Sequence, residues 1–124
     1  MITVYGIRSC DSCRRALKWL GEQQIEHQFH DVREDGLDDT MLRRFQSAAQ
    51  SSGATTENDP LLNRRSTTWR QLADDERAHL DAAGIRSLIL LHPALMKRPV
   101  IDTGHRLIVG FDTTSRDRIL ADSP

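Results

Sequence analysis

The chain contains two cysteines, Cys10 and Cys13, with two residues between them. With this spacing, one thiolate can attack a disulfide and the second thiol can attack the mixed disulfide that results. A purely structural disulfide is a weaker interpretation, because closing so short a loop removes little entropy from the unfolded chain. The pair therefore predicts thiol–disulfide chemistry, with Cys10 as the reacting residue.

Two other uses of paired cysteines are metal binding and packing in a core. A zinc site needs two further ligands, and the sequence has no second Cys-x-x-Cys and no His-x-x-x-His. His27 and His30 fall in an expected strand, where residues three apart point to opposite faces. Core packing suits Cys13, which lies on the apolar face of an expected helix, but it suits Cys10 poorly. We expect no metal and no bound cofactor, since no metal, nucleotide or flavin motif is visible.

The elements around the pair are expected to place Cys10 at the start of a helix. Residues 2–5 have a strand pattern, residues 6–9 form a turn, and residues 11–20 have the apolar spacing of a helix. Unpaired N–H groups and the helix dipole favour a thiolate there, and such sites lower a cysteine pKa from about 8.5 to between about 3.5 and 7.5. Three arginines lie within five residues of Cys10 in the sequence: Arg8, Arg14 and Arg15.

The remaining pattern predicts further strands and helices. In order they are a strand over 25–32, an acidic turn over 31–39, a helix capped by Asp38 or Asp39, a loop over 48–60, short helices within 61–72, 74–83 and 85–92, a hairpin with strands at 100–101 and 107–109, and a closing helix over 112–120 capped by Asp112 or Thr113. Asp74 or Asp75 is the expected cap of the helix over 74–83, and Gly84 is the expected break after it. The strands at 2–5 and 25–32 should pair in parallel through a right-handed crossover.

This order of elements is that of an α/β fold of the thioredoxin-like (glutaredoxin-like) class with an inserted helical subdomain. We expect one domain of 124 residues, with the insertion at roughly 37–95. The net charge of −1 gives no reason to expect direct binding of nucleic acid or of an anionic membrane. The sequence has no apolar run of membrane-spanning length and no signal-peptide pattern, so we expect a cytoplasmic protein.

Three separated segments resemble a known family. VYGIRSCDSCRRALKWL, LLNRRSTTWRQL and LHPALMKRPVI followed by LIVGF are similar to the arsenate reductase (ArsC) family in its glutaredoxin-related branch. Within it, the chain resembles the YffB-type subgroup, which is described as glutathione-dependent thiol reductases. The redox-sensing regulator Spx is a sister group. The resemblance covers essentially the whole chain.

The resemblance implies roles for individual residues. Cys10 matches the catalytic or sensing cysteine, and Arg98 matches an arginine that binds an oxyanion beside the thiol. Pro99 matches the cis proline, next to which an extended thiol substrate pairs. Glutathione, or a mixed disulfide of it, is the expected co-substrate. Its two carboxylates could pair with Arg64, Arg65 or Arg98, and either external glutathione or Cys13 would resolve the intermediate.

The chain departs from the family pattern where arsenate would bind. Asn63 stands where the second of three oxyanion arginines is expected, with Arg64 and Arg65 beside it as possible substitutes. The third position falls near Val109 or Gly110, which carry no charge. Arg106 is a cation close to that position in the sequence. The sequence thus predicts a thiol reductase that turns over arsenate poorly. The two alternatives are an arsenate reductase and an Spx-like regulator that binds RNA polymerase.

Overall fold

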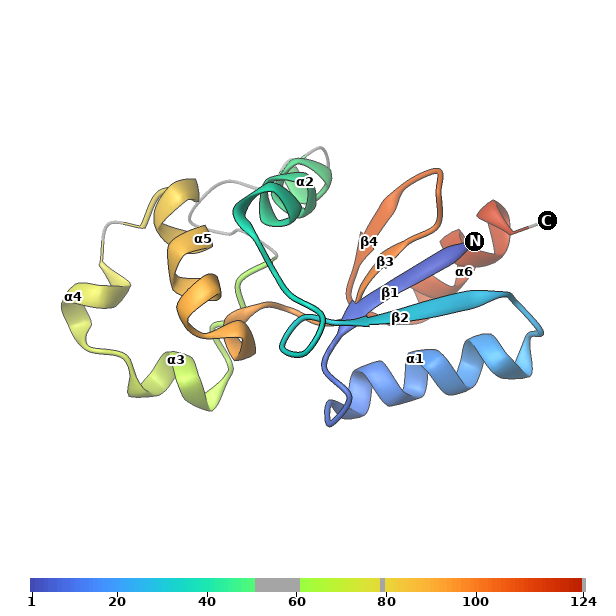
Figure 1. Ribbon diagram of the computed structural model, residues 1–124, viewed down its shortest axis with the longest axis horizontal. Coiled ribbons are helices and arrows are strands. Elements are labelled where there is room, and N and C mark those ends of the chain that lie inside the picture. Colours follow the sequence, from blue (N-terminus) through green and yellow to red (C-terminus); the bar gives the residue numbers. More distant parts are fainter. Residues whose placement is uncertain (51–60, 79, 124) are drawn as a thin grey trace. The chain divides into compact units, whose positions relative to one another are not determined.

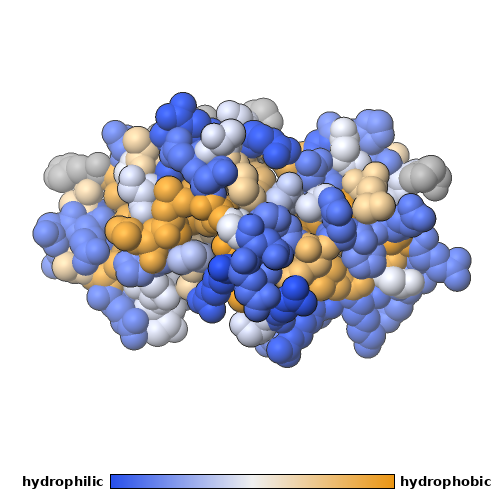
Figure 2. Space-filling view, viewed as in Figure 1, coloured by the Kyte–Doolittle hydropathy of each residue, from blue (hydrophilic) through white to orange (hydrophobic). Residues whose placement is uncertain are grey.

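The computed structural model describes residues 1–50, 61–78 and 80–123, and the chain folds as two compact units (Figure 1). One unit comprises Met1–Gly36 and Arg98–Pro124, and the other comprises Leu37–Lys97. The prediction of a single domain with an insertion at roughly 37–95 stays a prediction. On the face drawn in Figure 2, hydrophilic side chains surround several separate apolar patches.

The unit that contains both cysteines is a four-stranded sheet with two helices. Its elements are β1 (Ile2–Gly6), α1 (Asp11–Glu22), β2 (His27–Asp31), β3 (Val100–Asp102), β4 (Leu107–Val109) and α6 (Thr113–Asp122). The strand order is β2-β1-β3-β4. As predicted, β1 and β2 are parallel, with Val4 opposite Phe29, and β3 and β4 form an antiparallel hairpin. The strand β3 runs antiparallel to β1, with Ile101 opposite Val4. This is the predicted thioredoxin-like class.

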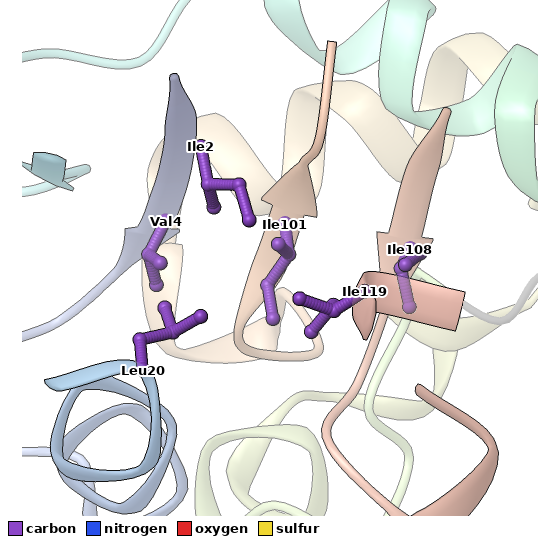
Figure 3. Packing of buried hydrophobic residues seen from close by; sticks show 6 residues of the cluster. All are labelled: Ile2, Val4, Leu20, Ile101, Ile108 and Ile119. Carbon is purple, nitrogen blue, oxygen red and sulfur yellow. The ribbon is translucent and has the colours of Figure 1, made fainter. Parts of the chain in front are cut away.

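Both helices of this unit contribute to one apolar core. Figure 3 shows side chains from three strands directed toward Leu20 of α1 and Ile119 of α6. The buried members of this cluster are Ile2, Val4, Leu20, Ile101, Ile108 and Ile119. Burying each such side chain contributes about 1.5–3 kcal/mol. The core therefore fixes α1 against β1, and with it the turn between them that carries Cys10.

The far end of the hairpin is tied to α6. Thr103 donates its hydroxyl to Asp122 at 2.7 Å, and Arg106 makes a two-point contact with the same carboxylate, with Nε–Oδ2 at 2.8 Å and Nη2–Oδ1 at 3.0 Å. Gly104 occupies the turn with φ of 90°, which is a conformation that suits glycine. The helix α6 begins where Asp112 accepts the N–H of Ser115 at 2.9 Å, so the predicted cap at Asp112 is confirmed.

The second unit is helical. Its elements are α2 (Asp39–Gln50), α3 (Thr67–Gln71), α4 (Asp74–Arg77), α5 (Ala82–Leu91) and a 3-10 turn η1 (Pro93–Leu95). Arg86 of α5 joins two residues of α2, with Nε 2.7 Å from Oδ1 of Asp39 and Nη1 3.0 Å from Oε1 of Gln46. The predicted cap of α2 is confirmed at Asp38, which accepts the N–H of Met41 at 2.8 Å.

Three local predictions in this unit are wrong. The loop expected from residue 48 begins later, because α2 continues to Gln50, and residues 51–60 lie outside the described ones. The helix expected over 74–83 is only Asp74–Arg77, and Ala73 stands at its N-cap in place of Asp74 or Asp75. Gly84 is not a break. It lies in the first turn of α5, where its N–H donates to the capping carboxylate of Asp81 at 2.7 Å.

Candidate active site

Cys10 is the N-cap residue of α1. Its backbone is extended, with φ of −81° and ψ of 126°, and its N–H donates to the carbonyl of Ile7 at 3.0 Å. Its carbonyl accepts the N–H of Arg14 at 3.0 Å, which starts the helix. The side chain is partly exposed. Cys10 thus occupies the predicted position, at the end of a tight turn where sulfur can meet both a substrate and the N–H groups of the helix.

The surroundings of Cys10 favour its thiolate. Burial alone raises the pKa of Cys10, but the N–H of Cys13, the positive charge of Arg98, the thiol of Cys13 and the N–H of Ser12 all lower it. The net result is a pKa below the ordinary value for cysteine. The thiol makes no capping hydrogen bond of regular geometry. The N–H groups of Cys13 and Ser12 lower the pKa of Cys10 because they stabilise the charged form of the thiol.

Cys13 has the opposite character. It is completely buried, and burial is the main reason that its pKa rises to about 11. The N–H of Ile7 lowers the pKa of Cys13, while the neighbouring charge of Cys10 raises it further. Both cysteines are free thiols. At neutral pH this pair therefore presents one activated sulfur at the surface and one protonated sulfur beneath it.

Gly6 makes room for the buried thiol. A β-carbon at position 6 would overlap Sγ of Cys13 and would lie 3.5 Å from a ring carbon of Phe29. The carbonyl of Gly6 accepts the N–H of Val32 at 2.9 Å, which continues the pairing of β1 and β2 past the sheet. The sequence predicts a turn residue at Gly6, whereas this glycine ends β1 and supplies the space that Cys13 fills.

Arg98 and Pro99 belong to the same unit as the cysteines. The peptide bond between them is cis, as the resemblance implied, and the carbonyl of Pro99 accepts the N–H of Gly110 at 2.8 Å. Nε of Arg98 is buried and has no hydrogen-bond partner in the described part of the chain. Buried polar atoms are nearly always paired, so this donor, whose charge acts on Cys10, is a candidate for binding an anionic group of a substrate.

Arg64 and Arg65 lie in the helical unit, so their predicted contact with substrate at Cys10 stays a prediction. Both are exposed, and the guanidinium of Arg64 lies 5.6 Å from the ring centre of Trp69. Asn63 has a structural role here. Its Oδ1 accepts the N–H of Arg65 at 3.1 Å, and its N–H donates to the carbonyl of Leu95 at 2.7 Å.

Arg106 does not serve the Cys10 site. It follows β3, whose last residue Asp102 is paired with Thr3 near the start of β1, whereas Cys10 follows the end of β1. Its guanidinium is held by Asp122.

One residue beside the turn is missed by sequence reasoning. The expected strand over 25–32 and the expected acidic turn over 31–39 both include Asp31. It is the buried last residue of β2, and its carboxylate accepts the N–H of Arg8 at 3.0 Å, a contact that the sequence did not indicate. The contact spans 23 positions in the sequence. Only the parallel pairing of β1 and β2, which places both strand ends side by side, could have indicated it.

Among the described residues, no group of three or more His, Cys, Asp or Glu side chains is arranged to hold a metal ion. In the same part of the chain, none of the helices has the length and apolar character needed to cross a membrane.

The sequence matches the model of the ArsC family over residues 5–119. It is 43% identical over 112 residues to an uncharacterized protein of Haemophilus influenzae, covering 90% of this chain and 92% of that protein. It is 28% identical to the global transcriptional regulator Spx of Streptococcus pyogenes, covering 90% of this chain and 79% of that protein.

Two solved structures are also similar. The YFFB protein superimposes with a TM-score of 0.84 at 34% identity, over 97% of this chain and 99% of that one. An arsenate reductase (ArsC) related protein from Brucella melitensis has a TM-score of 0.71 at 38% identity, over 96% of this chain and 93% of that one.

Proposed function

This chain belongs to the ArsC family, and we propose that it is a thiol–disulfide oxidoreductase whose nucleophile is Cys10. The proposal rests on the lowered pKa of Cys10. This residue lies at the start of a helix, and the positive charge of Arg98 helps to stabilise its thiolate. Attack on a disulfide requires a thiolate, and a thiol that titrates near the ambient pH combines a useful thiolate fraction with good nucleophilicity.

We propose a glutathione mixed disulfide as the substrate. The Cys10 thiolate attacks the glutathione sulfur, the S–S bond of the substrate breaks, and the other thiol leaves as a thiolate that takes up a proton. This leaves glutathione joined to Cys10. A thiolate of a second glutathione then attacks that glutathione sulfur, which releases oxidised glutathione and restores the Cys10 thiolate. The substrate thiol is reduced and the second glutathione is oxidised, while the first glutathione passes from the mixed disulfide into oxidised glutathione without a change of oxidation state.

External glutathione is the better resolving thiol of the two alternatives. With a pKa of about 11, Cys13 has very little thiolate at neutral pH, and the main cause of that value is burial. We propose that Cys13 mainly donates its S–H toward Cys10 and so stabilises the attacking thiolate, in agreement with its effect on the pKa of Cys10.

Arg98 is our candidate for holding the substrate. Glutathione carries two carboxylates, and a buried guanidinium N–H without a partner among the described residues forms a strong hydrogen bond with such a group. Pro99 would place an extended substrate backbone beside the thiol, and Arg64 and Arg65 are candidates for the second carboxylate. These assignments extend the family resemblance to the residues of this chain.

The test is reduction of a glutathione mixed disulfide, with glutathione and glutathione reductase supplied to follow turnover. We expect activity in the wild type, none in Cys10→Ser, and retained activity in Cys13→Ser. Loss of activity in both variants, with normal alkylation of Cys10 in Cys13→Ser, would show that Cys13 resolves the intermediate. Full activity in Cys10→Ser would refute the proposed function.

A non-enzymatic regulator is the second candidate, because the chain is 28% identical to Spx over 90% of its length. In that case a Cys10–Cys13 disulfide would alter a surface that binds RNA polymerase. A pull-down with RNA polymerase under oxidising and reducing conditions distinguishes the regulator from the oxidoreductase. Redox-dependent capture, together with no turnover of mixed disulfides, would favour the regulator.

A further inference from the structure

A buried carboxylate that takes no part in the exchange steps supports the turn that carries Cys10. Asp31 is 2% exposed. Its Oδ2 accepts the N–H of Arg8 at 3.0 Å, and its Oδ1 accepts the N–H groups of Arg33 at 2.8 Å and Glu34 at 3.2 Å. These three donors come from the turn before α1 and from the chain after β2. The side chain thus joins two segments that are distant in the sequence.

The contact with Arg8 acts on a peptide group that also binds Cys10. The N–H of Arg8 and the carbonyl of Ile7 belong to one planar peptide unit. The N–H is held by Asp31, and the carbonyl accepts the N–H of Cys10 at 3.0 Å. Rotation of this peptide unit would break both hydrogen bonds together. The orientation of the Cys10 backbone therefore depends on the Asp31 carboxylate through one rigid group.

The next peptide group is held from the helix. The carbonyl of Arg8 accepts Nε of Arg14 at 3.1 Å. The N–H of Ile7 lies against Cys13, where it lowers the pKa of that thiol. The turn from Ile7 to Cys10 is therefore fixed by Asp31 on one side and by α1 on the other.

The charged groups around Asp31 define what its removal would do electrostatically. Nε of Arg8 lies 3.9 Å from Oδ2 of Asp31 and 3.2 Å from Oε2 of Glu34. On the other side, a carboxylate oxygen of Asp35 accepts the N–H of Asp31 at 2.9 Å. Burial raises the pKa of Asp31, but the N–H groups of Arg8, Arg33 and Glu34 and the charge of Arg8 bring it below the ordinary value, so Asp31 is ionised at neutral pH.

We propose that Asp31 is a positioning residue for Cys10: its carboxylate orients the Ile7–Arg8 peptide unit, and thereby sets the sulfur against the N–H groups of α1. The inference rests on the proposed function only for its turnover measurement. The reactivity of Cys10 itself can be measured without any disulfide substrate.

The decisive comparison is between Asp31→Asn and Glu34→Gln. Each removes one negative charge that pairs with Arg8, but only Asp31→Asn alters the acceptor of the Arg8 N–H. Removing a negative charge near a thiol favours the thiolate and lowers its pKa. Loosening the turn has the opposite effect, because the sulfur then lies less well against the helix N–H groups.

We expect Asp31→Asn to raise the pKa of Cys10 by about half a unit or more, and to slow turnover of the mixed disulfide by about ten- to a hundredfold, the usual cost of a small misplacement. Glu34→Gln should leave both close to wild type. The pKa is read from the pH dependence of Cys10 alkylation, with peptide mapping to exclude labelling of Cys13. A lowered or unchanged pKa in Asp31→Asn would overturn the inference.

A second control separates positioning from general loss of stability. Ile119→Val removes a methyl group from the core shared with α1 and lowers the melting temperature without touching the turn. We expect its Cys10 reactivity to equal that of the wild type. Equal slowing in Ile119→Val and Asp31→Asn would overturn the inference.

If Asp31→Asn does not fold, Asp31→Glu provides the test. It keeps the charge but moves the carboxylate by one methylene. A positioning role therefore predicts slower alkylation of Cys10, whereas a role of the charge alone predicts an unchanged alkylation rate. Absence of turnover in the wild type would refute the proposed function, while the alkylation comparison would still decide the role of Asp31.

Discussion

Cys10 is the N-cap of α1 and Cys13 lies in the first turn of the same helix, yet their pKa values are shifted in opposite directions. Both lose solvation on folding. Cys10 gains the charge of Arg98 and two backbone N–H groups, and these outweigh its burial. Cys13 is completely buried and also faces the charge of Cys10. The fold thus separates the two sulfurs of a Cys-x-x-Cys pair into a nucleophile and a protonated neighbour.

We predict that brief treatment with limiting iodoacetamide at neutral pH labels Cys10 before Cys13. The labelling rate of Cys10 should stop rising once the pH exceeds its lowered pKa, because the thiolate is then fully formed. In Cys10→Ser, the rate at Cys13 should still be rising above pH 9, since its pKa is about 11 and is due mainly to burial. Peptide mapping measures both, and predominant labelling of Cys13 in the wild type would contradict the assignment.

Gly6→Ala should destabilise the protein by about 1–3 kcal/mol, the usual range for overpacking, because the new β-carbon would overlap Sγ of Cys13. Gly21→Ala is the matched control. Its β-carbon meets nothing within 4 Å, and alanine is favoured in a helix by about 0.5–1 kcal/mol. Urea unfolding measures the free energy of unfolding of each variant.

The double variant Gly6→Ala/Cys13→Ala tests whether this contact is the cause. Removing Sγ should recover most of the unfolding free energy that Gly6→Ala loses. The effects of the two substitutions on that free energy should therefore be non-additive by about 1 kcal/mol or more. Additive losses would show that Gly6 is required for another reason.

Arg98→Ala should lower kcat/KM strongly while it changes the melting temperature only slightly. It removes a charge that lowers the pKa of Cys10, so that pKa should rise and the pH profile of alkylation should move to higher pH. Loss of one charged hydrogen bond to substrate costs about 1.5–3 kcal/mol, or roughly ten- to a hundredfold in kcat/KM. Arg98→Lys should restore part of the pKa shift without restoring turnover, because lysine lacks the Nε–H that lies buried in Arg98.

Arg118→Ala, at an exposed position of α6, is the control for removing one arginine. It should change neither the alkylation profile nor turnover. An Arg98→Ala variant with normal kcat/KM and a large loss of melting temperature would instead assign Arg98 to the fold.

The strands and helices around Cys10 could be predicted because their signals are local. Apolar spacing gives α1, and the compact strand–helix–strand order requires the parallel pairing of β1 and β2. The role of Asp31 was not predicted, since its contact with the N–H of Arg8 spans 23 positions in the sequence and forms only where β1 and β2 end side by side. The charge of Arg98 on Cys10 was reached only through the family resemblance, because no local pattern relates the two.

Two of the wrong predictions in the helical unit, the cap of α4 and the break at Gly84, have a common origin in glycine and aspartate. Glycine is a poor helix former, which predicts a break at Gly84, but in a first turn its N–H can bind a cap, here Asp81. Aspartate is a preferred cap, yet Asp74 lies inside α4, where it pairs with Arg77. Local propensity identifies such residues as helix-end residues without fixing which side of the boundary they occupy.

Arsenate should be a poor substrate. Of the three positions where the family resemblance expects an arginine, one carries Arg98, the second carries Asn63 with Arg64 and Arg65 beside it, and the third, near Val109 or Gly110, carries no charge. Asn63 is engaged in the turn before α3, and Arg106 is paired with Asp122. A small, strongly hydrated oxyanion depends on such charged donors, so the loss of even one should weaken binding by roughly ten- to a hundredfold.

A glutathione mixed disulfide should be affected less, because it also offers a backbone and a second carboxylate for binding. We therefore expect slow release of arsenite with glutathione and glutaredoxin supplied, under conditions where mixed-disulfide reduction is readily measured. Asn63→Arg is the informative variant. If position 63 binds the oxyanion, as the family resemblance implies, Asn63→Arg should lower the KM for arsenate and leave the KM for the mixed disulfide unchanged. Efficient arsenate reduction by the wild type at micromolar substrate would refute this view and make arsenate reductase the better assignment.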